Sequence, residues 1–190
     1  MSSQITSDIV GAARRLARDG RLRAASMQDL ADEAGLSRVT LYRRGATRDN
    51  VLQALRAELA REERDAIWPA IVSDGTGRER LERALRALCA SGEDTLGLFG
   101  ALSDEVSDAI YHDGDERRLT REEFVAPFRR LLLDGAADGS LRPLTDPDEV
   151  ATILYNQVSW TYRHLRTGHG WDAERAADGV IALALDGLAA

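Results

Sequence analysis

The sequence of 190 residues has no lysine, a single cysteine and no apolar run of the length that crosses a membrane. A membrane-spanning helix needs about 20 consecutive apolar residues, so the sequence predicts that the chain does not enter a membrane. One cysteine, Cys89, excludes an internal disulfide and is typical of a reducing cytoplasm, where we expect the protein to be. Because Cys89 lies in the apolar segment LERALRALCA, we expect a small buried side chain and not a nucleophile.

The usual sequence patterns of enzymes and metal proteins are also missing. The chain has no His-Glu-x-x-His, Cys-x-x-Cys or Gly-x-Ser-x-Gly pattern and no phosphate-binding glycine loop. None of the three histidines follows a glutamate by three residues, as helical di-metal proteins require. Glu105, Asp108 and His112 share a helical face, and a cation site there is the alternative to a solvated acidic loop. The sequence therefore predicts no enzyme, no cofactor and no bound metal.

The alternation of apolar and polar residues that marks a strand is absent, whereas helical spacing occurs along nearly the whole chain. A first helix starts near Ile5 and stops at RDG, and Pro127 either kinks a later helix or marks its start. The segment after residue 90 is less regular, up to about residue 116. The fold class predicted is all-α. The other expected helices are 27–34, 38–44, 48–68, 78–90, 147–166 and one that follows Asp172.

Positive charge is concentrated near the N-terminus although the whole chain carries a net charge of −7. Residues 1–50 hold nine arginines and six acidic residues, which gives +3, and the rest of the chain carries −10. Arginine presents a planar fork of donors that fits phosphate groups and guanine edges. The uneven charge predicts an acidic partner for the N-terminal segment.

The turn AGLS joins two short predicted helices, 27–34 and 38–44, inside this positive segment. Gly35 suits a turn with positive φ, and Ser37 is placed to cap the second helix. Leu41 is the apolar plug of the second helix, so the side chains around it point outward or flank it. A helix of this length fits the major groove, and the pair predicts a helix–turn–helix on double-stranded DNA. An ordinary helical hairpin with a solvated arginine edge is the alternative.

The wider stretch SMQDLADEAGLSRVTLYRRGATRDNVLQAL resembles the N-terminal domain of the tetracycline-repressor-like (TetR) family of transcription regulators. In that family a glycine ends helix one, Ser or Thr opens helix two, and IA..AGVS and TLY.HF.SK..L follow. Here ARDG, Ser26, DLADEAGLS, TLYR and TRDNVL match in register, and the resemblance is specific over residues 5–60. Two positions depart from the pattern. Gly45 replaces a bulky residue, so a less fixed junction is expected there, and Arg48 replaces the usual lysine.

The resemblance implies a helix–turn–helix domain over residues 1–48 and an effector-binding and dimerisation domain over residues 49–190. Phosphates would be met at the helix N-terminus of Ser26, at Tyr42 and near Arg48. Arg38 is the candidate for a bidentate contact to guanine. The residues expected to contact DNA are Ser26, Ser37, Arg38, Thr40, Tyr42, Arg43, Arg44 and Arg48.

The helix expected over 147–166 carries two stripes with much apolar surface. One stripe holds Val150, Leu154, Val158 and Leu165, and the other holds Ile153, Gln157, Trp160 and His164. A helix that is apolar around so much of its circumference packs against more than its own core. A four-helix bundle between two copies explains this, and the resemblance implies the same homodimer; a central helix of a monomer is the alternative. The residues expected at the dimer interface are Val150, Leu154, Val158, Leu165, Ala177 and Ala184.

The resemblance also implies a pocket for an unidentified small-molecule effector in the second domain. Its walls would be apolar, with a few polar contacts from one face of the helix over 147–166. Membership of the core or of the dimer interface is the alternative for the same side chains. The residues expected at the pocket are Leu85, Leu88, Phe99, Tyr111, Phe124, Phe128, Asn156, Trp160 and His164.

The function expected from this sequence is that of a homodimeric transcriptional repressor. It would bind a pseudo-palindromic operator and leave it when the effector binds. The alternative is a helical metal- or small-molecule-binding protein, or an interaction adaptor, that no longer reads DNA. Gly45 is the residue that favours the adaptor, and Arg38, Arg43 and Arg48 oppose it.

Overall fold

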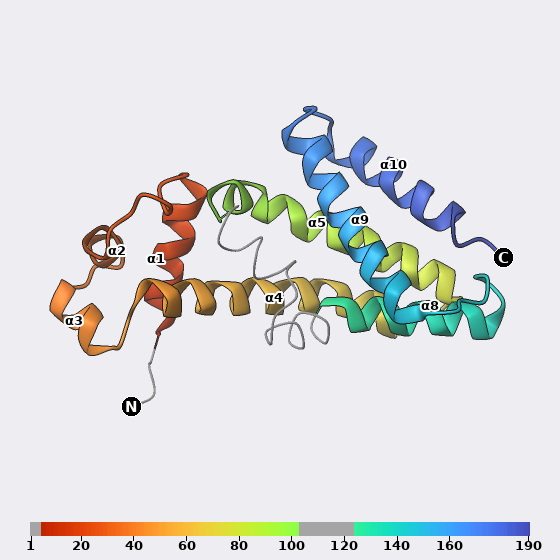
Figure 1. The fold of residues 1–190 in the computed structure, drawn as a ribbon, viewed down its shortest axis with the longest axis horizontal. Helices are drawn as coiled ribbons and strands as arrows, with labels where there is room; N and C mark the ends of the chain where they lie inside the picture. Colours follow the sequence, from red (N-terminus) through yellow and green to blue (C-terminus); the bar gives the residue numbers. More distant parts are fainter. Residues whose placement is uncertain (1–4, 103–123) are drawn as a thin grey trace. The chain divides into compact units, whose positions relative to one another are not determined.

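The chain folds into helices (Figure 1), as seen in a computed structural model that describes residues 5–102 and 124–190. Helices are the only regular elements in those two ranges, which confirms the all-α prediction. None of these helices has the length and apolar character to cross a membrane. The described helices are α1 (Ser7–Arg18), α2 (Met27–Glu33), α3 (Arg38–Arg43), α4 (Arg48–Val72), α5 (Gly77–Leu102), α8 (Ala126–Asp138), α9 (Pro147–Thr167) and α10 (Ala173–Asp186).

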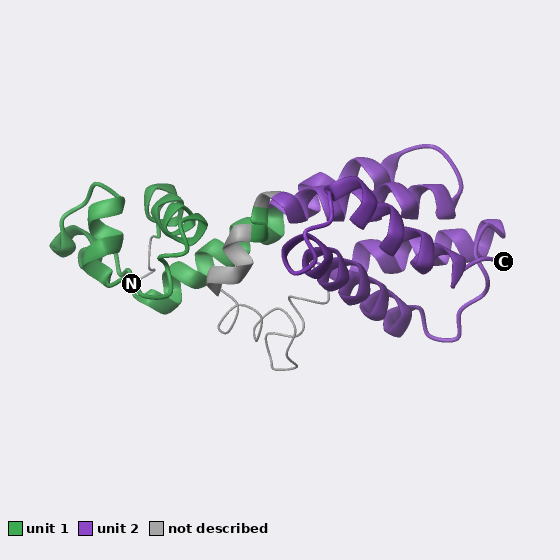
Figure 2. Ribbon diagram, turned by 90° about the horizontal axis from the view of Figure 1, so that it is seen from above, with its two compact units in different colours: residues 1–61, 95–112 green, residues 62–94, 113–190 purple. Residues whose placement is uncertain are grey.

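The chain divides into two compact units, which Figure 2 draws in different colours. Unit 1 comprises residues 1–61 and 95–112, and unit 2 comprises residues 62–94 and 113–190. This division differs from the boundary at residue 48 that the family resemblance implied. The helix α4 contributes its first part to unit 1 and its second part to unit 2.

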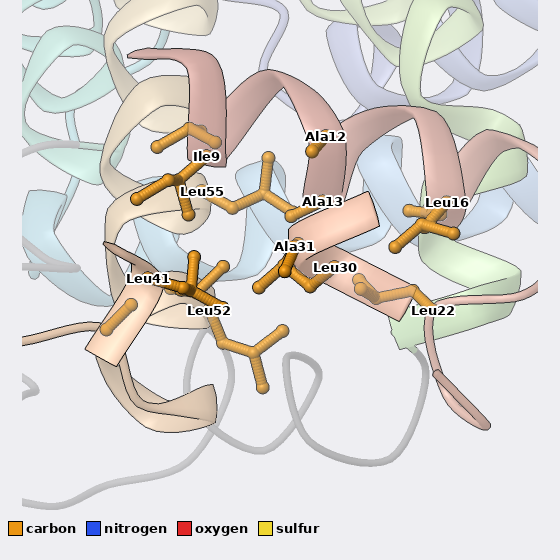
Figure 3. Packing of buried hydrophobic residues seen from close by; sticks show 14 of the residues in the cluster. Ile9, Ala12, Ala13, Leu16, Leu22, Leu30, Ala31, Leu41, Leu52 and Leu55 are labelled. Carbon is orange, nitrogen blue, oxygen red and sulfur yellow. The ribbon is translucent and has the colours of Figure 1, made fainter. Parts of the chain in front are cut away.

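The core of unit 1 is built from side chains of four helices that point toward one another (Figure 3). Ile9 and Leu16 come from α1, Leu30 from α2, Leu41 from α3 and Leu55 from α4, and each is buried. Burial of one such side chain is worth about 1.5–3 kcal/mol. Small buried alanines let the helices approach closely; they are Ala12, Ala13 and Ala31. Leu41 is the one residue of the short helix α3 that is buried in this core. The other side chains of α3 are not part of it.

Polar caps begin the helices where the sequence predicts them. Ser26 and Asp29 form a reciprocal capping box at the start of α2. Ser37 caps α3, and Thr47 Oγ1 accepts from the backbone N–H of Asn50 at the start of α4. Asp146 and Asp172 cap α9 and α10 in the same way.

The helix α5 continues to Leu102, so the prediction that it ends near residue 90 is wrong. Glycine lowers helix propensity by about 1 kcal/mol, and Gly92 lies just beyond the predicted end. In the structure Gly92 is buried beneath the ring of Tyr162, which a Cβ would meet at 3.6 Å. The next residue, Glu93, accepts hydrogen bonds from Tyr162 and Arg166 of α9. Contacts with α9 therefore stabilise the helix where local propensity is weak.

The helix α4 also runs further than predicted, past Pro69 to Val72. Proline removes one backbone hydrogen bond and disfavours a helix interior. Here it lies within the last turn of α4, and Ser73 Oγ donates to the carbonyl oxygen of Ala70 just after the proline. The defect therefore falls where few intrahelical bonds remain to be lost. Pro127, in contrast, lies at the start of α8. Of the two roles expected for it, a kink or a helix start, the structure shows the helix start.

The N-terminus of α5 packs on α8 at a glycine pair. A Cβ built on Gly77 would lie 2.1 Å from the backbone nitrogen of Gly135 and 2.3 Å from its Cα. Hydrogen bonds fix the same contact: the N–H of Gly77 donates to Asp138 Oδ2 at 2.6 Å, and the N–H of Arg78 donates to Ser140 Oγ at 3.1 Å. These two bonds satisfy free N–H groups at the start of α5. The backbones touch so closely that no side chain fits at Gly77.

Candidate nucleic-acid interface

The exposed surface of α3 collects the polar and cationic side chains predicted to bind DNA. Leu41 is fully buried and fixes the rotation of the helix against the core. As a consequence Arg38, Tyr42 and Arg43 are exposed, as the sequence predicted. An α-helix with its polar side chains exposed in this way fits the major groove of DNA.

Arg38 and Tyr42 hold one another one helical turn apart. Arg38 Nη2 donates to the Tyr42 hydroxyl oxygen at 3.3 Å, and the guanidinium carbon lies 5.4 Å from the centre of the ring. A cation above an aromatic ring is worth about 0.5–1 kcal/mol at an exposed site. Because arginine has five N–H donors, this contact leaves donors for a base edge or a phosphate. The tyrosine therefore orders the arginine before DNA arrives.

The hydroxyl groups predicted to meet DNA are hydrogen-bonded within the chain. Ser37 Oγ accepts from the N–H of Thr40 at 3.1 Å and lies 2.8 Å from Thr40 Oγ1. Ser26 Oγ donates to Asp29 Oδ2 at 2.7 Å, and this bond lowers the pKa of Asp29 below its usual value. The two serines thus begin the helices α2 and α3 and fix where their N-termini lie.

Arg44, which was expected to point outward or to flank Leu41, contacts the N-terminal end of α1. Its Nη1 donates to Thr6 Oγ1 and to Asp8 Oδ2, both at 2.9 Å. The pKa of Asp8 is lowered by its hydrogen bond with Thr6 and, next, by its bond with Arg44. In this position Arg44 joins the end of α3 to the start of α1.

Arg48 binds the loop between α1 and α2. Its Nη1 donates to the carbonyl oxygen of Ala25 at 3.1 Å, and its Nη2 donates to those of Leu22 and Arg23, both at 3.2 Å. A fork of donors reaches three carbonyls at once, which a lysine ammonium does less readily. The arginine that replaces the family's lysine therefore has a structural role, because it fixes the loop that leads into α2.

We expect Arg48→Ala to lower the free energy of unfolding by about 2 kcal/mol, because three hydrogen bonds from a charged donor are lost. Urea unfolding of the full chain measures this change. Arg43→Ala is the matched control, since Arg43 is exposed and its loss should change the stability by less than about 0.5 kcal/mol. Unchanged stability of the Arg48 variant, together with weaker DNA binding, would assign Arg48 to a phosphate instead.

Gly45 ends α3 in the left-handed conformation, with φ of 71°. Its N–H donates to the carbonyl oxygen of Tyr42, and the N–H of Ala46 donates to that of Leu41. Asn50 Nδ2 donates to the carbonyl oxygen of Gly45 at 3.1 Å. A positive φ favours glycine, so this turn needs the residue that departs from the family pattern. The junction, expected to be less fixed, is held by these hydrogen bonds.

Val39 is a candidate interface residue that the sequence reasoning missed. Its side chain is 70% exposed on α3, next to Arg38. An apolar side chain in the major groove can contact the methyl group of thymine. The sequence contains a signal for this exposure. Because Leu41 points into the core, a residue two positions earlier on the same helix points outward. Counting apolar residues alone assigns such a valine to the core.

The pocket residues predicted for unit 2 divide between the interior and the surface. Leu85, Leu88 and Phe128 are buried, whereas Phe124 and Asn156 are half-buried. Trp160 and His164, in contrast, are exposed on α9. Tyr111 and the side chain of Phe99 lie outside the described residues.

The residues predicted for the dimer interface differ in their exposure. Leu154 and Val158 are covered by the chain's own helices, and so is Ala184 of α10. Predicted interface residues that are half-buried are Val150, Leu165 and Ala177. The apolar side chains left exposed on α9 and α10 are instead Ile153 (54%), Trp160 (44%) and Leu183 (71%). Sequence spacing found both stripes but did not say which one turns inward.

Cys89 is buried, as predicted, and burial raises the pKa of its thiol to about 12. A thiol with that pKa stays protonated near neutral pH and is a poor nucleophile. The proposed cation ligands Glu105, Asp108 and His112 lie outside the described residues. Across 5–102 and 124–190, no three His, Cys, Asp or Glu side chains gather closely enough to hold a metal ion.

Two family models match the chain. Residues 9–55 match the model described as bacterial regulatory proteins, tetR family, which spans α1 to the first part of α4. Residues 74–188 match the model described as tetracyclin repressor-like, C-terminal domain, which spans α5 to α10. The second match alone covers more than half of the chain.

Individual proteins give the same answer. The HTH-type transcriptional repressor KstR2 of Mycolicibacterium smegmatis is 25% identical over 185 residues, which cover 90% of this chain and 83% of the repressor. A TetR transcription regulator from Haloarcula marismortui has a TM-score of 0.77 at 22% identity, with 96% and 97% of the two chains covered. The ketosteroid transcriptional regulator KstR2 of Mycobacterium tuberculosis has a TM-score of 0.69 at 21% identity, with 100% and 98% covered. These matches and the helix–turn–helix of unit 1 lead to one conclusion: the chain belongs to the tetR family of bacterial regulatory proteins, and it is a DNA-binding transcriptional regulator.

Proposed function

We propose that two copies of this chain bind a pseudo-palindromic operator as a repressor and leave it when a small molecule binds unit 2. Each copy places α3 in the major groove of one half-site. Arg38 reads a guanine with two hydrogen bonds, Val39 contacts a thymine methyl group, and Arg43 binds a phosphate. The acidic remainder of the chain repels the DNA backbone elsewhere, which restricts binding to this surface.

The observation that carries this proposal is the exposed α3 with Arg38 held over Tyr42. The contact leaves the guanidinium group exposed on a short helix of which Leu41 is the buried residue. Ordering before binding reduces the side-chain entropy lost when the contact to DNA forms. The arrangement therefore favours a reading helix over a solvated edge.

The dimer is proposed to form through the exposed apolar side chains of α9 and α10. Ile153 and Trp160 of α9 and Leu183 of α10 would otherwise stay in contact with water. Burial of apolar surface drives most protein association, and a two-fold dimer presents two reading helices to two half-sites. The dimer thus doubles the DNA contact that one short helix makes.

The effector is proposed to act through α4, which contributes residues to both units. A ligand that changes the position of α4 in unit 2 also moves Leu52, Leu55 and Leu59 at its other end, and with them the spacing of the two reading helices. Effector and operator must then weaken each other's binding by the same factor.

Selection of genomic DNA fragments by the purified protein tests the proposal, with gel shifts at two salt concentrations as the readout. We expect a pseudo-palindromic sequence, whose binding weakens as salt rises because phosphates release counterions. Recovery of a single half-site without symmetry would contradict the dimer. Recovery of no sequence preference would contradict the reading role of α3.

We expect Arg38→Ala to weaken binding to the selected operator by about 5- to 150-fold, which corresponds to about 1–3 kcal/mol. The variant should also lose its preference at one base position of each half-site. Fluorescence anisotropy with operator duplexes that differ at single positions measures both effects. Arg43→Ala is the matched control, since it removes the same charge from α3 and should weaken all duplexes evenly. An even loss for Arg38→Ala as well would reject its base-reading role.

A further inference from the structure

Unit 2 contains a buried carboxylate that no contact of the described chain fully satisfies. Glu63 lies on α4, and its Oε1 atom is excluded from solvent without a hydrogen-bond partner among the described residues. Its Oε2 atom accepts from the hydroxyl group of Tyr155 on α9 at a long 3.4 Å. A buried acceptor without a donor costs about 1–3 kcal/mol, and more when it is charged. Such a group is usually paired with a donor of the protein, with a water molecule or with a ligand.

The surroundings of Glu63 supply one opposite charge and several aromatic rings. Arg163 of α9 is 8% exposed, and its positive charge is close enough to act on Glu63. The rings of Phe124 and Phe128 lie 5.7 and 6.0 Å from the ring of Tyr155, centre to centre. The side chains of this part of unit 2 are therefore mainly apolar and aromatic, as in the walls of many ligand sites.

The pKa of Glu63 supports this description of the site. Burial raises that pKa from the usual 4.5 to about 7, and the opposing effects of Arg163 and the Tyr155 hydrogen bond do not cancel the rise. The shift means that the carboxylate has less hydrogen bonding than its burial requires.

We propose that Glu63 Oε1 accepts a hydrogen bond from a hydroxyl group of an uncharged, mainly apolar effector of this regulator. The inference rests on the proposed binding of a small molecule in unit 2, and it names the chemistry of that molecule. A hydroxyl group supplies the donor that Oε1 lacks. Burial of the rest of the molecule against Phe124 and Phe128 supplies most of the binding energy.

The charges around the site argue for an uncharged ligand. Ionised Glu63 and Arg163 together carry no net charge. A carboxylate ligand would be attracted by Arg163 but repelled by Glu63. A cationic ligand would be attracted by Glu63 but repelled by Arg163. Either would leave an unbalanced charge in a buried place, which costs several kcal/mol per ion. A hydroxyl donor satisfies Oε1 and keeps the balance.

The test compares alcohols with their methyl ethers, which keep the skeleton and lose only the donor. We would titrate the full chain with three pairs: 2-naphthol and 2-methoxynaphthalene, 4-butylphenol and 4-butylanisole, and 1-decanol and decyl methyl ether. Calorimetry at pH 8 measures each Kd. We expect at least one alcohol to bind tenfold or more tightly than its ether. That preference should shrink at pH 6, where Glu63 is mostly protonated, because the hydroxyl group binds the ionised carboxylate better.

Two variants decide whether Glu63 is the acceptor. Glu63→Gln should erase the preference for the alcohol and its dependence on pH, whereas binding of the ether persists and reports that the variant is folded. Asp65→Asn removes a carboxylate from an exposed position of the same helix and should keep the preference.

Three results would overturn the inference: no alcohol that binds better than its ether, a preference that survives in Glu63→Gln, or tight binding of the matched carboxylate 2-naphthoate alone. The DNA selection described above uses protein without any of these compounds. Failure of that selection would reject the regulator and would leave the comparison of alcohols and ethers unaffected, so the two failures are distinguishable.

Discussion

Gly77→Ala is expected to destabilise the protein by about 4 kcal/mol or more, which for a chain of this length lowers the Tm by roughly 8–16 °C. The added Cβ would lie 2.1 Å from the nitrogen and 2.3 Å from the Cα of Gly135. Both are backbone atoms inside α8, so neither can turn away as a side chain can. Relief requires α5 to move from α8, and that movement also breaks the hydrogen bond from the N–H of Gly77 to Asp138.

A second substitution of the same kind separates the clash from any general effect of alanine. Gly179 lies in α10, where a Cβ would meet only Trp171, at 3.9 Å. Gly179→Ala is therefore expected to leave stability unchanged or raise it by up to about 1 kcal/mol, since alanine favours a helix. Thermal unfolding of both variants, followed by circular dichroism, gives the comparison. Equal melting temperatures would show that the glycine pair tolerates a side chain and that the close contact is not required.

The second large effect concerns pH. The free energy of unfolding should fall as the pH rises from about 4.5 to about 7, and the Glu63→Gln variant should lack this part of the fall. In the folded chain the pKa of Glu63 is about 7, above its usual value of 4.5. The folded state thus binds a proton that the unfolded state has already released. The stability gained from that proton is complete below pH 4.5 and is lost as the pH passes 7.

The size of the effect follows from the shift. Each pKa unit corresponds to about 1.4 kcal/mol, so up to about 3 kcal/mol separates the two ends of this range. Urea unfolding of the wild type and of Glu63→Gln at pH 5 and pH 8 measures it. All other groups are common to the two proteins and cancel in the difference. Asp65→Asn should follow the wild type, and a Glu63→Gln variant with the pH dependence of the wild type would contradict the burial of this carboxylate.

The helix–turn–helix was accessible from sequence because its determinants are local. A cap such as Ser26 or Ser37 bonds to a residue three positions away, and Gly35 and Gly45 impose turns on their own neighbours. Leu41 fixes the rotation of α3 and, through it, the outward side of Arg38. Each of these relations is contained in a few consecutive residues, so spacing alone indicates it.

The remaining features depend on residues that are distant in sequence. The loop carbonyls bound by Arg48 lie more than 20 positions before it, so neither local spacing nor the family resemblance, which implied a phosphate near Arg48, indicates this contact. Spacing identified two stripes on α9, but only the packing of α8 and α10 decides which stripe is inside. The glycine pair at Gly77 and the orphaned oxygen of Glu63 are invisible until two helices are brought together.

The passage of α4 through both units has a consequence for recombination between relatives. An exchange of effector-binding segments that joins two parents at residue 48 would take Val51, Leu52 and Leu55 from one parent and the rest of their core from the other. A crossover after Arg61 takes all of these core residues from one parent. Hybrid regulators built as biosensors, and natural mosaics that survive selection, should therefore have their junctions in the middle of this helix and not at its start.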